Sequence, residues 1–245
     1  MSTSRKAIKE MRTKKKRQQR MATMLVIVGI ALLLVAFMAV PSVVNALRPA
    51  GPVTAITPVP RPLADGLAMG NPEAPVIIEV FEDFQCPMCA VYTYDAGKKI
   101  TDNYVANGQV YYVFRQYPFL DDTKVAKESD QSANASMCAA EQDKFWEYHD
   151  ILFANQNGEN QGAFNDKRLI AFAESIGLDM KSFQSCFDEN RYQADIDADI
   201  QKALEYGVSG TPSVFVNGQA ITPGYVPSYE TMQQAIEAEL TSAGG

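Results

Sequence analysis

Two cysteines separated by two residues, Cys86-Pro87-Met88-Cys89, are the part of this sequence whose residue types and spacing most directly imply chemistry. They follow an apolar, β-branched segment, residues 76–81, and precede a segment of helical character, residues 90–107. The first N–H groups of a helix lack intrahelical partners, and the helix dipole is positive there. Both favour a thiolate, the nucleophile of disulfide exchange. The sequence therefore predicts a redox-active Cys86–Cys89 pair, whose second thiol attacks the mixed disulfide made by the first.

Metal binding and a purely structural bridge are the alternatives for such a pair. A tetrahedral metal site needs four ligands, and the chain offers besides these only one histidine, His149, and two cysteines isolated from each other. A disulfide within so small a loop adds little chain-entropy stabilisation. We therefore expect redox chemistry by the thiols themselves, with no metal and no cofactor.

The N-terminal part of the chain predicts a membrane anchor. Residues 1–20 hold nine Lys and Arg and one acid, whereas the whole chain carries a net charge of −7. Residues 21–40 contain no charge and are long enough to cross a hydrocarbon core of about 30 Å as a helix. The basic cluster predicts a cytoplasmic N-terminus. We expect a cytoplasmic tail at 1–20 and a single transmembrane helix within an anchor at 21–46.

A cleaved signal peptide is the main alternative to this anchor. Val44-Asn45-Ala46 places small residues where a signal peptidase would act, so cleavage near Ala46 would release a secreted protein. The apolar run is longer than a usual signal peptide, which favours the uncleaved anchor. In both cases the remainder lies outside the cytosol, where disulfides persist. Its acidic charge argues against nucleic acid as a partner.

A proline-rich linker at 47–68 precedes the folded part, and we expect it to be an extended spacer and not a packed element. The folded part, residues 69–245, is long enough for one domain with an insertion. Its elements run in the order strand, helix, strand, then helices only from about 121 to 206, then two strands and a helix. The expected elements are strands at 75–84, 110–114, 213–216 and 219–221, and helices at 90–107, within 126–153, at 169–176, after Asp179, around 196–204 and from 228. This order predicts a small α/β sheet with a helical domain inserted in its middle.

The same order, with Phe84-Gln85-Cys86-Pro87-Met88-Cys89 early and Gly210-Thr211-Pro212 late, resembles the thioredoxin-fold DsbA family. The resemblance covers residues 70 to about 240, including residues 70–76 at the entry to the first strand and 138–149 in the helical insert. It implies a thioredoxin-like fold, with Cys86 as the exposed nucleophile and Cys89 as the buried resolving thiol. It also implies that Pro212 is a cis-proline facing this pair and that the Thr211 backbone is available to a substrate chain.

Two departures from the family pattern concern the chemistry of the pair. Strong oxidants of the family often carry histidine at the place of Met88, so we expect a less oxidising couple here. Many members have a buried acid at the place of Val80. We expect Glu82, on the same strand face as Val80, to take the Cys89 proton. Glu79 and Asp83 are the other candidates, and the alternative is that all three are ordinary surface acids.

Three further groups of side chains invite a role. Cys138 and Cys186, 48 positions apart, are predicted to form a structural disulfide, and two buried free thiols are the alternative. For His149 we expect no catalytic task. The aromatic side chains of the insert are expected in its core, namely Phe145, Trp146 and Phe153.

These observations together predict a membrane-anchored, monomeric thiol–disulfide oxidoreductase. We expect it to act as an oxidase on reduced secreted or surface proteins. By the family resemblance, a DsbB-like or VKOR-like membrane partner would reoxidise it. The alternatives are a disulfide isomerase or reductase and, from another class, a non-catalytic peptide-binding or chaperone module on the same fold.

Overall fold

The computed structural model describes residues 49–121 and 127–243, and near the N-terminus residues 20, 21, 23–25, 27–30, 33 and 37. The chain divides into two units, Met1–Pro49 and Ala50–Gly245. In the first unit the described residues between 20 and 37 are helical. The predicted tail at 1–20 and most of the predicted anchor at 21–46 lie outside the described residues. Across the described ranges, no helix is both long and apolar enough to span a membrane.

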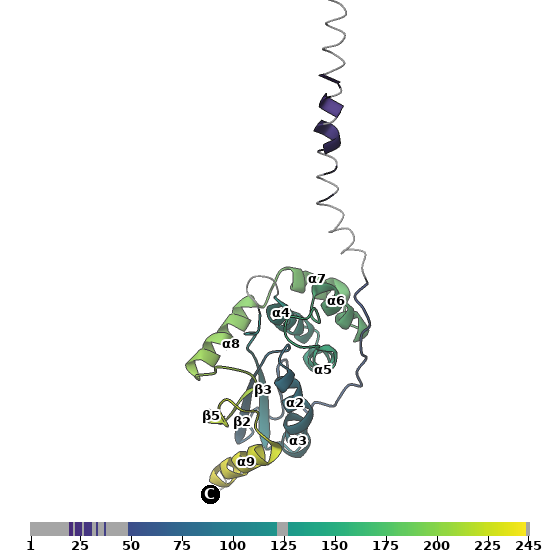
Figure 1. Cartoon of the computed structure of the whole chain (residues 1–245). Coiled ribbons are helices and arrows are strands. Elements are labelled where there is room, and N and C mark those ends of the chain that lie inside the picture. Colours follow the sequence, from purple (N-terminus) through teal and green to yellow (C-terminus); the bar gives the residue numbers. More distant parts are fainter. Residues whose placement is uncertain are drawn as a thin grey trace, which may run out of the picture. The chain divides into compact units, whose positions relative to one another are not determined.

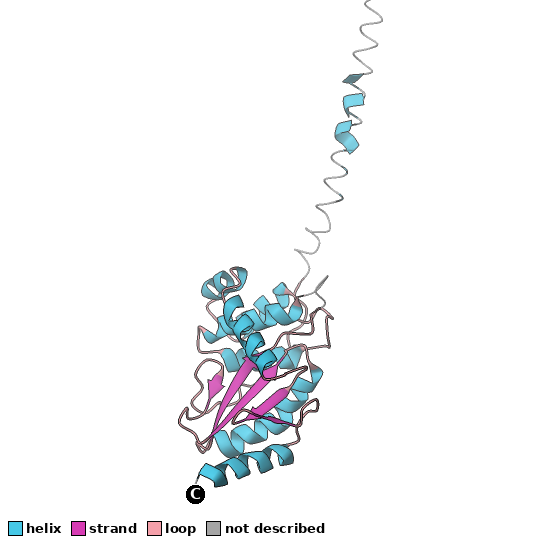
Figure 2. Ribbon diagram, turned by 90° about the vertical axis from the view of Figure 1, so that its left-hand side faces the viewer, coloured by secondary structure: helices cyan, strands magenta, loops and turns pink. Residues whose placement is uncertain are grey.

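The second unit contains a five-stranded sheet in the order β1-β3-β2-β4-β5 (Figure 2). The central strands β2 (Val76–Glu82) and β3 (Val110–Gln116) are parallel, as the expected strand–helix–strand order requires. β4 (Ser213–Val216) runs antiparallel to β2, and β5 (Gln219–Ile221) forms one edge. The other edge, β1 (Ala68–Met69), was not predicted, because two residues are too short to show a pattern.

A continuous helical run follows the two cysteines. It begins as α2 (Pro87–Tyr92) and continues through the π-helical η1 (Thr93–Gly97), α3 (Lys98–Ile100) and the π-helical η2 (Thr101–Val105). The C-terminal α9 (Tyr229–Ala243) contacts η1, α3 and β2.

The two faces of the sheet bury different side chains because alternate strand residues point to opposite faces. Ile78 and Val80 join the main core. Phe81 packs on the other face against α8 (Gln193–Glu205), in a smaller cluster with Ala203 and Phe215. Each face is thus covered by helices.

The helical segment expected at about 121–206 contains no strand in its described part. Figure 1 shows four of its helices gathered at one end of the sheet: α4 (Glu128–Ala140), α5 (Phe145–Asn155), α6 (Asp166–Ser175) and α7 (Met180–Asp188). Asp179 caps α7 by accepting a hydrogen bond from the Ser182 amide. The Sγ atoms of Cys138 and Cys186 are bonded, so a disulfide joins α4 to α7 inside the core.

The proline-rich linker is not a free spacer, and this expectation was wrong for its described part. Thr54 and Asn155 of α5 exchange two hydrogen bonds, of 2.7 and 2.9 Å. Arg61 forms an ion pair of 2.7 Å with Asp150, and Val53 packs against the core. The prolines keep the backbone extended, and an extended backbone offers N–H and C=O groups that side chains of the insert can bind.

The Cys138–Cys186 disulfide gives a prediction about stability. We expect replacement of both by alanine to lower the free energy of unfolding by roughly 4 kcal/mol, because the bridge closes a long loop. Urea denaturation measures the difference, in a background in which Cys86 and Cys89 are serine. In that background the bridge is the only possible disulfide, so a reducing agent should destabilise the background protein but not the alanine variant. Two free thiols in the unreduced, denatured background protein would contradict the prediction.

Candidate active site

Cys86 lies at the N-cap of α2, where the chain leaves β2 and turns into the helix. Its backbone is extended, with φ −75° and ψ 115°, and Pro87 occupies the first helical turn, where its missing N–H costs no hydrogen bond. Cys89 is completely buried, and only 6% of Cys86 is exposed. The two sulfurs are not bonded to each other. Cys86 is therefore the more accessible thiol but not an exposed one, which corrects the expectation from the family resemblance.

The segment containing Thr211 and Pro212 covers the Cys86 sulfur. The Thr211–Pro212 peptide bond is cis, and Cys86 Sγ donates a hydrogen bond of 3.3 Å to the Thr211 carbonyl oxygen. Two segments 125 positions apart therefore meet at the sulfur. The Thr211 hydroxyl is buried and accepts or donates no hydrogen bond within the described part of the chain, so it is available to the thiolate form of Cys86.

The surroundings separate the acidities of the two thiols. A hydrogen bond from the Cys89 thiol, assisted by Thr211 and by the backbone N–H groups of Cys89 and Met88, lowers the pKa of Cys86 to about 6 although burial opposes this. Burial, followed by the Cys86 sulfur and the carboxylate of Glu82, raises the pKa of Cys89 well above its usual value. At neutral pH the pair therefore holds one thiolate, on Cys86, and one thiol, on Cys89.

Glu82 is the last residue of β2 and is 1% exposed. Thr93 Oγ1 donates a hydrogen bond of 3.4 Å to its Oε2 atom, and its Oε1 atom has no hydrogen-bond partner among the described residues. Burial, and next the negative charge of Cys86, raise the pKa of Glu82 well above that of an ordinary glutamate. The protonated form of this carboxyl group is therefore favoured more strongly than that of an ordinary glutamate.

The alternative that the three acids are surface groups was wrong, because all three are buried. Glu79 lies on the opposite face of β2, where Arg115, Lys202 and Tyr206 donate hydrogen bonds to it. Although burial raises it, the hydrogen bonds from Lys202 and Arg115 lower the pKa of Glu79 overall. Glu79 is thus an ion-pair residue, separated by the sheet from the cysteines.

Asp83, the third acid, positions the turn between β2 and α2. Its carboxylate accepts hydrogen bonds from the Gln85 amide (2.8 Å), the amides of Phe119 and Leu120 (3.0 Å each) and the Ser129 hydroxyl (2.7 Å). Burial raises the pKa of Asp83 to about 6. With these donors occupying its oxygens, Asp83 has a structural task at the site.

Gln85 was missed by sequence reasoning. Its buried amide group donates to the Ser129 hydroxyl (2.7 Å) and accepts from the Asn160 backbone (2.6 Å). Gln85 and Asp83 therefore attach the active-site turn to the helical insert. An Asp two residues before another polar residue, between a strand and a helix, is a turn signal that could have indicated this role.

His149 is buried among aromatic rings, with the Phe153 ring centroid at 4.8 Å and those of Phe84 and Phe114 at 6.0 and 5.5 Å. Burial lowers its pKa. Its Nδ1 lies 2.9 Å from Asp150 Oδ1. Phe145, Trp146 and Phe153 are buried around it. Within the described ranges, no group of three His, Cys, Asp or Glu side chains could hold a metal ion.

Comparison with known proteins identifies the fold and the family. A family model described as "Thioredoxin" matches residues 63–238. The "Probable disulfide bond formation protein D" of Bacillus cereus is 27% identical over 177 residues, which cover 71% of this chain and 78% of that protein. The "Na(+)/H(+) antiporter NhaA 3" of Salinispora tropica is 33% identical over 174 residues, which make up only 24% of the antiporter.

The crystal structure of oxidised BdbD from Bacillus subtilis covers 78% of this chain with a TM-score of 0.65 and 23% identity, and the match includes 100% of that structure. This likeness shows a thioredoxin-like α/β fold, as the order of elements predicted. Because the family model spans residues 63–238, and because the relative matched over 78% of its length carries the disulfide-forming name, the chain belongs to the thioredoxin family as a DsbA-type thiol–disulfide oxidoreductase.

Proposed function

We propose that this protein is an extracytoplasmic oxidase that introduces disulfides into secreted or surface proteins. The observation that carries the proposal is the separation of the two thiol pKa values, with Cys86 lowered to about 6 and Cys89 raised. A low pKa shows that the Cys86 thiolate is stabilised, and a stabilised thiolate favours the reduced form of the pair. A substrate disulfide is therefore favoured over the Cys86–Cys89 disulfide at equilibrium, which is the direction an oxidase needs.

The reaction proceeds in two exchanges. A substrate thiolate attacks Cys86 Sγ of the oxidised pair, a mixed disulfide forms, and Cys89 leaves as a thiolate that takes a proton from Glu82. The second substrate thiolate then attacks the substrate sulfur of the mixed disulfide and expels Cys86 as a thiolate. The substrate loses two electrons and gains a disulfide, and the enzyme pair gains both electrons.

The location and the partners are part of the proposal. The uncharged residues 21–40 beside a basic tail support a single-pass anchor, with secretion after cleavage near Ala46 as the alternative. The buried Cys138–Cys186 disulfide supports an oxidising compartment. Reduced secreted proteins would be the substrates of a monomeric enzyme, and a DsbB-like or VKOR-like membrane protein would accept its electrons.

The direct test is the oxidation of a reduced, unfolded disulfide protein. We expect the oxidised wild-type protein to restore the activity of such a substrate stoichiometrically, and Cys86→Ala to restore none. Mixed with a scrambled substrate that contains disulfides, Cys89→Ala should accumulate a mixed disulfide through Cys86, visible on a non-reducing gel, because no second thiol is present to resolve it. A wild-type protein that oxidises no dithiol would instead indicate the peptide-binding module. Recovery of a scrambled substrate but not of a reduced one would indicate an isomerase.

The pKa of Cys86 provides a second test. Ultraviolet absorbance of the thiolate in the reduced protein should titrate with a midpoint near 6. Cys89→Ala should raise this midpoint, because the Cys89 thiol provides the largest of the lowering contacts. Cys86→Ala, as the control, should show no transition in this range. A midpoint that stays unchanged in Cys89→Ala would refute this assignment of the stabilising contact.

Met88 gives a third test, which concerns oxidising strength. Its side chain is 46% exposed and cannot donate a hydrogen bond to the thiolate. We expect Met88→His to shift the equilibrium with glutathione about tenfold toward the reduced enzyme, because a cation beside the thiolate stabilises it. Met88→Leu, which adds no donor, should leave the equilibrium unchanged. Equal shifts in both variants would show that packing and not charge at this position sets the potential.

A further inference from the structure

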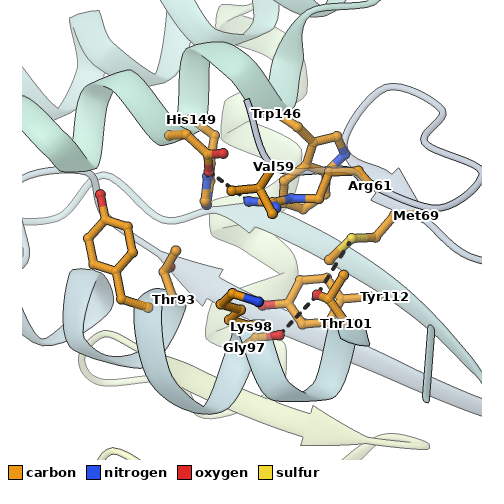
Figure 3. A pocket seen from close by; sticks show the side chains of 12 residues that line it. Val59, Arg61, Met69, Thr93, Gly97, Lys98, Thr101, Tyr112, Trp146 and His149 are labelled. Atoms are coloured by element: carbon orange, nitrogen blue, oxygen red, sulfur yellow. Dashed lines mark hydrogen bonds and ion pairs between the residues drawn. The ribbon is translucent and has the colours of Figure 1, made fainter. Parts of the chain in front are cut away.

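A small pocket lies between α5 and the helical run that begins with the active-site cysteines (Figure 3). Its cavity volume is about 50 Å³. Side chains from the linker, from the helical run and from α5 line it. The polar and charged ones that matter here are Arg61, Thr93, Tyr94, Lys98, His149 and Asp150.

Thr93 belongs both to this pocket and to the active site. Its hydroxyl donates the hydrogen bond to Glu82 Oε2, and the residue also lines the cavity. Glu82 itself is 1% exposed, and its Oε1 atom has no partner in the described part of the chain. A proton that arrives on Glu82 therefore cannot pass directly to bulk solvent and must leave through a neighbouring group.

The pocket has the properties of a hydrated cavity. Two of its buried polar atoms, Arg61 Nε and Asp150 Oδ2, have no hydrogen-bond partner among the described residues, and such atoms in natural proteins are usually satisfied by water. A water molecule needs roughly 10–15 Å³ of this kind of volume, so a few waters fit. Tyr94 and the side chain of Lys98 are each 53% exposed, so the cavity reaches the surface beside them.

The charged side chains around the pocket are paired with side chains of opposite charge. Arg61 and Asp150 form an ion pair across the pocket, with the Arg61 guanidinium 5.3 Å from the Trp146 ring centroid. Burial disfavours a charge on His149, and Lys98 is paired with Asp102 at the surface. The other groups that interact with Glu82 are the two active-site sulfurs and the hydroxyls of Tyr92 and Tyr112, and Tyr112 also lines the pocket. Among the described residues that line the pocket, a proton leaving Glu82 therefore meets no unpaired cation that would repel it.

We propose that this pocket is the water-filled route by which the Cys89 proton reaches solvent, and that Thr93 is the positioning residue that connects Glu82 to its water. The inference rests on the proposed function, in which Glu82 exchanges a proton with Cys89. It adds a defined exit for that proton and a task for a pocket that the disulfide chemistry alone does not require.

The step belongs to the reoxidation of the enzyme, after Cys86 has formed a mixed disulfide with its oxidant. The mixed disulfide removes the Cys86 charge that helps to raise the pKa of Glu82, so Glu82 first gives its proton to Thr93 Oγ1, whose own proton passes to the pocket water. Cys89 then gives its proton to the Glu82 carboxylate, and the Cys89 thiolate attacks Cys86 Sγ. The Cys86–Cys89 bond forms, and the oxidant sulfur leaves with the electron pair of the broken bond. Glu82 is left protonated, as it must be to give a proton to Cys89 when the next substrate is oxidised.

The experiment measures this resolution step in the full-length protein. The reduced enzyme is mixed with oxidised glutathione, quenched with acid, and the Cys86–glutathione mixed disulfide is followed by intact mass. We expect Thr93→Val to slow its resolution about tenfold and to change the solvent deuterium isotope effect, while the rate of the first attack and the pKa of Cys86 remain as in the wild type.

Thr101→Val is the matched control. Thr101 lines the same pocket, but its hydroxyl bonds to the Gly97 carbonyl at 2.9 Å and not to Glu82. It should resolve the mixed disulfide at the wild-type rate. Glu82→Gln should slow resolution, and adding Thr93→Val to it should slow it no further, because both act on one proton path.

Three results would overturn the proposal, and each contradicts a different part of it. Equal slowing by Thr93→Val and Thr101→Val would show a packing effect. Slowing by Glu82→Gln without slowing by Thr93→Val would remove the route through the pocket and leave the role of Glu82 intact. No effect of Glu82→Gln would remove the role of Glu82 in the proposed function and this route with it.

Discussion

The rest of this structure depends on the hydrogen bonds that stabilise a negative charge on the Cys86 sulfur. A thiolate that is 6% exposed must obtain from the protein the hydrogen bonds that water would give it. The donors come from the Cys89 thiol, the first turn of α2 and Thr211. The sheet brings them together, because β2 precedes α2 and pairs with β4, which begins directly after Pro212. The register that places Phe81 opposite Ser213 thus also places Cys86 beneath Thr211.

The helical insert contributes to the same site through hydrogen bonds with the active-site turn. Asp83 and Gln85 bind its backbone and side chains from one side. Gln156, the residue directly after α5, donates hydrogen bonds to the carbonyl oxygens of Phe84 (3.3 Å) and Cys86 (3.4 Å). These bonds fix the residues that precede the nucleophile, so the orientation of the sulfur depends on the insert as much as on the sheet. The insert is therefore a structural part of the redox site.

Predictions that rested on local signals agree with the structure, whereas two that depended on distant contacts, the exposure of Cys86 and the unpacked linker, do not. The hairpin at Asn217-Gly218 follows from residues that tolerate positive φ, and both have it. The cap at Asp179 likewise depends on three residues of chain. By contrast, the burial of Cys86 depends on Thr211, and the packing of the linker depends on Asn155, 101 positions from Thr54. A single sequence contains no periodic pattern that records such a contact.

The two glutamates of β2 show how one strand can give the same residue type opposite chemistry. Successive strand residues point to opposite faces, so Glu79 faces Arg115 and Lys202, while Glu82 faces the core, where no cation is among the groups that shift its pKa. Glu82 and Val80 share a face, so an acid at Glu82 lies roughly 7 Å along the strand from the place of the usual family acid. That displacement is toward the cysteines, and it brings the carboxyl group to Thr93. Because side chains two residues apart on a strand share a face, the acid can lie two residues further along and still face the core. At this position Glu82 also accepts a hydrogen bond from Thr93.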